Sequence, residues 1–127
     1  MIVGIGTDIV RVARLESGWN RFGARYAERI LSAEECREFE RTARPFHFLA
    51  KRFAAKEATA KALGTGFRGA FGLHDIVVRH DDFGCPQLVL SGGAQALAAL
   101  RGVCAMHVTL SDEEEYALAF VVLENKA

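Results

Sequence analysis

The sequence contains little proline or cysteine, no long apolar run and no surplus of charge of either sign. Among 127 residues the only prolines are Pro45 and Pro86, and Cys36, Cys85 and Cys104 lack the paired spacing of a disulfide framework or a zinc site. The 16 basic and 16 acidic residues balance, which argues against a dedicated nucleic-acid binder. No apolar run reaches membrane-spanning length, and the start MIVGIGTDIV lacks the features of a secretion signal. We therefore expect a soluble cytoplasmic protein that binds neither nucleic acid nor membrane.

The composition predicts one folded domain spanning residues 1–127. Half of the residues are hydrophobic and 25% are charged, which is the balance of an ordinary globular protein. A chain of this size buries roughly two-thirds of its unfolded surface, which suffices for one core but leaves little to enclose a deep site. We expect a sizeable ligand to lie in a surface cleft or between subunits.

Hydrophobic patterning predicts an α+β fold in which a mostly antiparallel sheet packs against a long helix. The expected element order is β-α-α-α-β-β-α-β-β. Strands are expected at 2–10, 73–79, 87–90, 103–110 and 116–123. Helices are expected at 11–31 with breaks at Gly18 and Gly23, after the capping-box serine Ser32, at 45–63, and from Ser91 to near Gly102.

Two carboxylates occupy positions where a charge is unexpected. Glu57 falls on the apolar stripe of the helix that begins at Pro45, and Asp8 lies inside an apolar strand, where aspartate is rare. The residues alone leave two interpretations of each: Glu57 forms a helical ion pair with Lys61 or binds a metal, and Asp8 caps the next helix or shares that metal. Two carboxylates, completed by water and ligand phosphates, are a typical Mg²⁺ site.

The long helix also carries basic residues and ends in a glycine-rich loop. Lys51, Arg52, Lys56 and Lys61 lie on its flanks, and the segment from Gly64 to Gly66 follows. Glycines let backbone N–H groups approach an anion, so phosphate is a candidate ligand here. The loop does not match the P-loop pattern, and a plain helix-to-strand connection is the alternative interpretation.

Three segments together resemble a known family. They are GIGTDIV at 4–10, FLAKRFAAKEATAKALGTG at 48–66 and MHVTLSDEEEYA at 106–117. The chain is similar to the holo-acyl-carrier-protein synthases, the short single-domain group of 4′-phosphopantetheinyl transferases. The resemblance implies their fold and Mg²⁺-dependent transfer of 4′-phosphopantetheine from coenzyme A to a serine of apo-acyl carrier protein, in fatty acid biosynthesis. It also implies a homotrimer with active sites between subunits.

The resemblance assigns roles to individual residues. Asp8 and Glu57 stand where the family binds magnesium, Lys61 stands at its active-site lysine, and Glu57 is the candidate acceptor of the serine proton, with Asp8 as the alternative. The positions expected at coenzyme A are Arg52, Lys61, Gly64, Gly84, Pro86 and His107. Arg14, Arg21 and Arg25 are expected at the docking surface for the acidic carrier, although a solvated arginine face is the simpler interpretation.

Two positions depart from the family pattern. Asp112 replaces a histidine found in other members, and Cys85 stands where a lysine is common, so one contact to the cofactor's phosphates is absent or comes from another basic residue. Two other functions remain open. They are a metal-dependent nucleotide or coenzyme A phosphohydrolase and a non-catalytic module that binds acidic partners.

Overall fold

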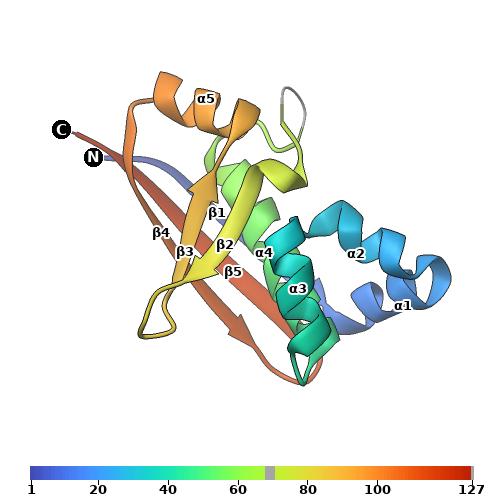
Figure 1. The fold of residues 1–127 in the computed structure, drawn as a ribbon. Helices are drawn as coiled ribbons and strands as arrows, with labels where there is room; N and C mark the ends of the chain where they lie inside the picture. The colour runs from blue at the N-terminus through green and yellow to red at the C-terminus, as the bar shows by residue number, and fades with distance from the viewer. Residues whose placement is uncertain (68–70, 127) are drawn as a thin grey trace.

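Five strands form two antiparallel sheets in the computed structural model, which describes residues 1–67 and 71–126. Strands β1 (Ile2–Arg11), β5 (Tyr116–Asn125) and β4 (Val103–Asp112) form a sheet in the order β1-β5-β4 (Figure 1). Strands β2 (Ile76–His80) and β3 (Pro86–Leu90) form a separate two-stranded sheet. All pairings among the described residues are antiparallel, as predicted.

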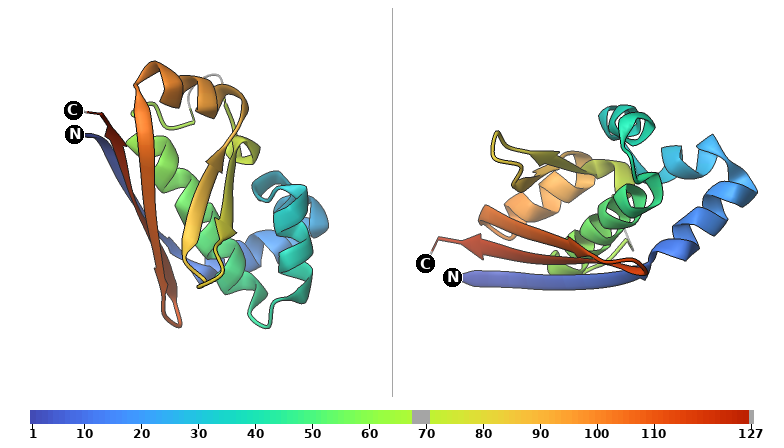
Figure 2. Two further views of the ribbon diagram at one scale, coloured as in Figure 1. Left: turned by 60° about the vertical axis from the view of Figure 1, so that its left-hand side comes forward. Right: turned by 90° about the horizontal axis from the view of Figure 1, so that it is seen from below.

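Five helices and one short turn complete the described part of the chain. They are α1 (Val12–Phe22), α2 (Ala24–Ile30), α3 (Ala33–Arg41), α4 (Pro45–Ala62), α5 (Gly92–Leu100) and the 3-10 turn η1 (Leu73–Asp75). Helix α4 crosses one face of the three-stranded sheet, and α1, α2 and α3 gather to one side of α4 (Figure 2).

Most predicted elements are confirmed, with shifts at their ends. The helical segment breaks at Gly23, whose φ is 67°, but Gly18 stays inside α1, where its missing side chain leaves room for the ring of Tyr26. Ser32 and Glu35 form the predicted capping box of α3. The strand expected from residue 73 begins only at Ile76, because residues 73–75 form the 3-10 turn.

Helix α4 and strand β1 approach unusually closely because small residues face each other. The buried face of α4 is rich in alanine, and Ala54, Ala55 and Ala58 are fully buried. In β1, a Cβ atom added to Gly4 would lie 2.0 Å from the carbonyl oxygen of Ala62, and one added to Gly6 would lie 1.9 Å from that of Ala58. Only glycine fits at either position without moving one backbone away from the other.

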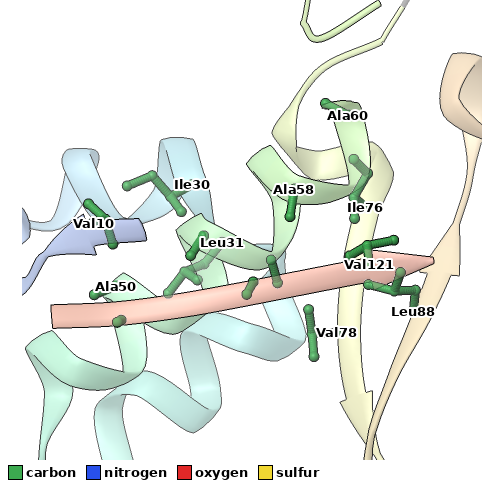
Figure 3. Packing of buried hydrophobic residues seen from close by; sticks show 14 of the residues in the cluster. Val10, Ile30, Leu31, Ala50, Ala58, Ala60, Ile76, Val78, Leu88 and Val121 are labelled. Atoms are coloured by element: carbon green, nitrogen blue, oxygen red, sulfur yellow. The ribbon is translucent and has the colours of Figure 1, made fainter. Parts of the chain in front are cut away.

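The hydrophobic core lies between α4, the three-stranded sheet and the β2–β3 hairpin. Figure 3 shows Val121 of β5 beside Ile76 and Leu88 of the hairpin, and Val10 of β1 toward the other end of the cluster. Ile30 and Leu31 add the end of α2 to the same cluster. One core therefore ties the helical segment and both sheets to α4.

The other face of the three-stranded sheet is apolar and exposed. Side chains alternate along β1, so Gly6, Asp8 and Val10 face α4, whereas Ile5 and Ile9 face outward and are each 61% exposed. Phe120 of β5, which is 41% exposed, pairs with Thr7 between these two isoleucines. No described helix covers this face (Figure 2).

Candidate active site

Asp8 lies where β1 passes over the C-terminal half of α4. The strand periodicity that buries Gly6 and Val10 turns Asp8 toward the helix, and its side chain is only 18% exposed. Its Oδ1 accepts a hydrogen bond of 3.1 Å from the Nζ of Lys61, which also donates to the carbonyl oxygen of Thr7 at 2.9 Å. The lysine therefore fixes both the carboxylate and the backbone of the strand.

Glu57 lies one helical turn before Lys61 and beside Asp8. Partial burial raises the pKa of the Glu57 carboxyl, and the charge of Asp8 raises it further, while the charges of Lys61 and Arg14 oppose the shift. The side chain is half-buried rather than part of the fully buried stripe that the helical wheel predicts. The two carboxylates, 49 positions apart in sequence, thus share one site.

The donor set of this site fits a hard divalent cation. Among residues 1–67 and 71–126, no group of three or more His, Cys, Asp or Glu side chains is placed to hold a metal. Two carboxylates without nitrogen or sulfur ligands match the way in which Mg²⁺ is held, with water and substrate phosphates completing the shell. Asp8 and Glu57 are therefore candidate ligands for a divalent cation such as Mg²⁺.

A groove of about 420 Å³ runs between β3 and β4, and two of the predicted coenzyme A residues line it. These are Pro86 at the start of β3 and His107, whose Nε2 hydrogen-bonds to the carboxylate of Glu124. Gly84 lies in the adjoining turn with a φ of 82°. Cys85, at the position where the resemblance predicts a lysine, lines the same groove and is exposed.

Gly64 lies at the end of α4, apart from the residues that line this groove. Its φ is 92°, and a Cβ atom added there would meet the guanidinium of Arg101 at 2.7 Å. Arg101 therefore packs directly on the glycine loop. This basic residue lies 37 positions further along the chain than Gly64, so the local motif does not reveal it.

Arg52 is not presented to solvent, contrary to what a direct contact with coenzyme A phosphate requires. Its side chain is 2% exposed, donates from Nη2 to Oε2 of Glu38 at 3.0 Å, and lies with its Nε 3.6 Å from Glu35. Its guanidinium also lies 4.4 Å from the centre of the Phe48 ring. Burial lowers the pKa of Arg52. These contacts give Arg52 a structural role.

Lys56 belongs to the same buried ionic cluster. Its Nζ donates to Oε1 of Glu35 and to the carbonyl oxygen of Ile30, each at 2.7 Å, and both charged side chains are fully buried. Glu35 also accepts a hydrogen bond from the backbone N–H of Val78 at 3.0 Å. The cluster joins α2, α3, α4 and β2. Burial lowers the pKa of Lys56, whereas the charge of Glu35 opposes this shift.

The basic residues of α4 therefore do not form one phosphate-binding flank. Lys56 and Arg52 are buried, Lys61 faces Asp8, and Lys51 lies 3.6 Å from the Asp112 carboxylate. Asp112, for which the resemblance predicts a histidine, thus ties the end of β4 to α4. Sequence position alone did not distinguish these four environments.

The arginines of the first helical segment separate into two groups. Arg21, Arg25 and Arg29 line a cleft of about 300 Å³ together with Phe22 and Tyr26, whose rings stack at 6.3 Å. This cleft spans the break at Gly23. Arg14 instead lies with its guanidinium 5.3 Å from the centre of the Phe53 ring on α4.

An α+β chain that presses a strand aspartate against a helical Glu-x-x-x-Lys motif has the architecture of the 4′-phosphopantetheinyl transferases. The profile of the 4′-phosphopantetheinyl transferase superfamily matches residues 4–121, and the chain belongs to this family.

Named relatives match over nearly the whole chain. The holo-acyl-carrier-protein synthase of Laribacter hongkongensis is 53% identical over 124 residues, which are 98% of this chain and 99% of the relative. The crystal structure of the enzyme from Neisseria meningitidis superimposes with a TM-score of 0.91 at 45% identity, covering 98% of this chain and 100% of that one. A Bacillus anthracis enzyme in complex with coenzyme A (3′,5′-ADP) gives 0.82 at 39% identity, covering 99% of each chain.

Proposed function

We propose that this chain transfers the 4′-phosphopantetheine group of coenzyme A to a serine hydroxyl of apo-acyl carrier protein. The observation that carries the proposal is the convergence of Asp8, Glu57 and Lys61 at one strand–helix contact. Relatives that match the whole chain are named for this activity, and one of them binds coenzyme A.

The reaction is an in-line displacement at phosphorus. The serine oxygen forms a bond to the phosphorus next to pantetheine, the anhydride bond breaks, and adenosine 3′,5′-bisphosphate leaves with the bridging oxygen. Such reactions depend on positioning and on neutralising charge. A magnesium ion held by Asp8 and Glu57 would supply Lewis-acid stabilisation of the diphosphate oxygens.

The chain's own residues supply the remaining functions. Lys61 presents an ammonium group at the same contact, where it stabilises the leaving phosphate. Glu57 is the proposed acceptor of the serine proton, directly or through an ordered water, because its half-buried carboxylate lies at the same strand–helix contact as Lys61. Asp8 is the alternative acceptor, but its carboxylate is already hydrogen-bonded to Lys61.

Coenzyme A and the carrier protein have separate candidate surfaces. We place the nucleotide in the groove lined by Pro86 and His107, with Gly84 in its adjoining turn, and the diphosphate toward Lys61 and the Gly64 loop. The cleft that carries Arg21 and Arg25 suits the acidic carrier protein. Charges at such a rim mainly set the association rate and the salt dependence of binding.

The exposed apolar sheet face supports assembly of several copies, which we propose form a homotrimer with active sites between subunits. A small chain gains both a covered sheet and a deeper cleft by associating in this way. Ile9→Lys and Phe120→Lys, compared with Ile9→Val, are expected to reduce the mass measured by sedimentation. An unchanged oligomer in both lysine variants contradicts the use of this face.

The absence of a disulfide among the three cysteines is consistent with a protein that functions in a reducing cytoplasm. Cys36, Cys85 and Cys104 are all free thiols, and the latter two are exposed. Within the part of the chain that the structure describes, no helix has the length and apolarity needed to cross a membrane.

Intact-mass spectrometry of an apo-carrier protein incubated with this chain, coenzyme A and Mg²⁺ tests the function. A phosphopantetheine-sized gain is the expected result. Consumption of coenzyme A without that gain indicates a hydrolase, and no reaction indicates a binding module.

Variants and chelation test the proposed metal pair. The variants Asp8→Ala and Glu57→Ala are expected to lose transfer activity. Glu40→Ala, which removes a carboxylate from the exposed side of α3, is the matched control and is expected to keep it. Chelation is expected to stop transfer until Mg²⁺ is restored. Full activity of either carboxylate variant at ordinary Mg²⁺ contradicts the metal site.

A further inference from the structure

Lys61 occupies the position of a counter-ion at the carboxylate pair. Its Nζ donates to Oδ1 of Asp8 at 3.1 Å and to the carbonyl oxygen of Thr7 at 2.9 Å. The Asp8 side chain is 18% exposed, whereas the Lys61 side chain is 52% exposed. The fold therefore holds the carboxylate in place, while the lysine that neutralises it has room to move its ammonium group toward solvent.

The charges at this contact do not balance in the metal-free protein. Asp8 and Glu57 bring two negative charges, and Lys61 brings one positive charge to Asp8. Among residues 1–67 and 71–126, no ion pair joins Glu57 to a basic side chain. A divalent cation bound by the two carboxylates balances them without the lysine.

The Lys61 ammonium and a divalent cation compete for the same carboxylate. Charges of the same sign repel strongly at the few ångströms that separate two groups bound to one carboxylate. An ammonium group has three N–H donors, and Asp8 and Thr7 use two of them here. Release from Asp8 leaves the Thr7 bond as a tether and makes two donors available to another acceptor.

We propose that Lys61 is the internal counter-ion of Asp8 in the metal-free protein and gives up this contact when a divalent cation binds. The carbonyl oxygen of Thr7 keeps the lysine at the strand during the exchange. One lysine thereby neutralises Asp8 before the cation is bound and then offers its released N–H groups to the diphosphate. This use of the released donors rests on the proposed function.

Metal affinity measured without coenzyme A or carrier protein tests the exchange. Calorimetric titration with Mg²⁺ and electron paramagnetic resonance with Mn²⁺ each give a dissociation constant. Lys61→Met removes the charge and the donors but keeps a long unbranched side chain. It is expected to bind either ion about 10-fold more tightly than the parent, because no ammonium group competes for Asp8. Lys61→Arg, which keeps the charge, is expected to lack this gain.

Lys51 supplies the matched control on the same helix. It lies ten residues before Lys61 on α4, and its Nζ is 3.6 Å from the Asp112 carboxylate. Lys51→Met therefore removes a lysine ion pair about 15 Å along the helix from the carboxylate pair. Its metal affinity is expected to equal that of the parent. An equal gain in Lys51→Met and Lys61→Met shows an effect of net charge alone and overturns the exchange.

Thermal unfolding supplies a second readout that does not depend on activity. Metal-free Lys61→Met is expected to have a lower Tm than the parent, because its two neighbouring carboxylates have lost the ammonium group. Saturating Mg²⁺ is expected to raise the Tm of this variant by more than that of the parent, since tighter binding to the folded state gives a larger stabilisation. An equal rise in both proteins contradicts the exchange.

The NMR signal of the Lys61 ammonium group distinguishes exchange from simple repulsion. In the metal-free protein its two hydrogen bonds are expected to protect this group from exchange with water. Saturating Mg²⁺ is expected to shift the signal and to speed this exchange. The ammonium group of Lys56, which is fully buried against Glu35, is the internal reference and is expected to stay unchanged. Metal binding that leaves the Lys61 signal unchanged shows that both cations share Asp8 and overturns the proposal.

The outcomes separate this inference from the proposed function, because the binding experiments contain neither substrate. An active parent whose Lys61→Met variant binds metal no more tightly overturns the exchange alone. A parent that shows the exchange but adds no phosphopantetheine to the carrier overturns the proposed transfer alone. A parent that binds neither Mg²⁺ nor Mn²⁺ overturns the exchange together with the metal pair, whatever its transfer activity.

Discussion

Replacing Gly6 with alanine tests whether close backbone packing positions Asp8. A Cβ atom at this position would lie 1.9 Å from the carbonyl oxygen of Ala58 and 2.8 Å from the backbone nitrogen of Ala62. Carbon and carbonyl oxygen normally approach to about 3.3 Å, so β1 and α4 must separate by roughly 1.4 Å. Neither neighbour is a flexible side chain that can turn aside.

The expected cost is large for a single methyl group. Overpacking typically lowers the free energy of unfolding by about 1–3 kcal/mol. A clash between two backbones is expected at the upper end, about 3 kcal/mol, and such a loss lowers Tm by roughly 10 °C or more in a chain of this length. Asp8 follows two residues later on the same face of β1. A displacement of about 1 Å at a reacting centre can reduce turnover by about 10²-fold, so the folded fraction is expected to be nearly inactive.

Thermal unfolding followed by circular dichroism, together with carrier-protein mass analysis below Tm, measures both effects. Gly72→Ala is the matched control, because a Cβ atom there meets no atom of residues 1–67 and 71–126 within 4 Å and the φ of Gly72 is −129°. A Gly6→Ala protein with the Tm and turnover of the parent refutes the argument that this glycine sets the strand–helix distance.

Two further predictions concern charges near α4. Glu35→Gln is expected to cost about 3–5 kcal/mol in urea unfolding, because it strands the buried ammonium of Lys56, whereas Glu35→Leu with Lys56→Met is expected to cost much less. Equal losses in the two proteins contradict this. Glu57→Gln is expected to raise the stability of the metal-free protein by about 1 kcal/mol or less at pH 7. The folded state raises the pKa of Glu57, so the ionised carboxylate destabilises the folded protein at pH values above its ordinary pKa of 4.5. The stability gained by Glu57→Gln must therefore disappear as the pH falls below 4.5. A gain that persists at pH 4 excludes this cause.

The sequence predicted most of the elements and named Asp8, Glu57 and Lys61 as candidate site residues, but it did not predict the partner of Lys61. Lys61 follows Glu57 by one helical turn, which left a local ion pair as an alternative. In the structure its ammonium bonds Asp8 of β1 instead. The residue that precedes α1 is Arg11, and no side chain caps that helix, so the alternative role of Asp8 as a cap is wrong. The partner of Lys61 and the orientation of Asp8 both depend on how β1 packs against α4.

The environments of the basic residues could not be predicted from helical spacing. Arg52 and Lys56 look like surface charges in a sequence rich in them, yet both are buried because α3 brings Glu35 and Glu38 against α4. The Glu35–Lys56 pair joins residues 21 positions apart, and nothing local identifies such a partner. The position of Arg14 over Phe53 depends in the same way on how two helices pack.

Packing and chemistry are interleaved in this site. The side of β1 that faces α4 carries Gly4, Gly6 and Asp8 in succession. The two glycines that allow the closest backbone contact therefore lie next to the aspartate on the same face of the strand. Two neighbouring carboxylates repel each other, and that repulsion tends to separate the elements that carry them. The glycine–alanine contact resists this separation with backbone packing that does not depend on charge. If this pair holds a cation as we propose, the small residues beside the two acids are needed as much as the acids themselves, because they keep the carboxylates close in the metal-free protein.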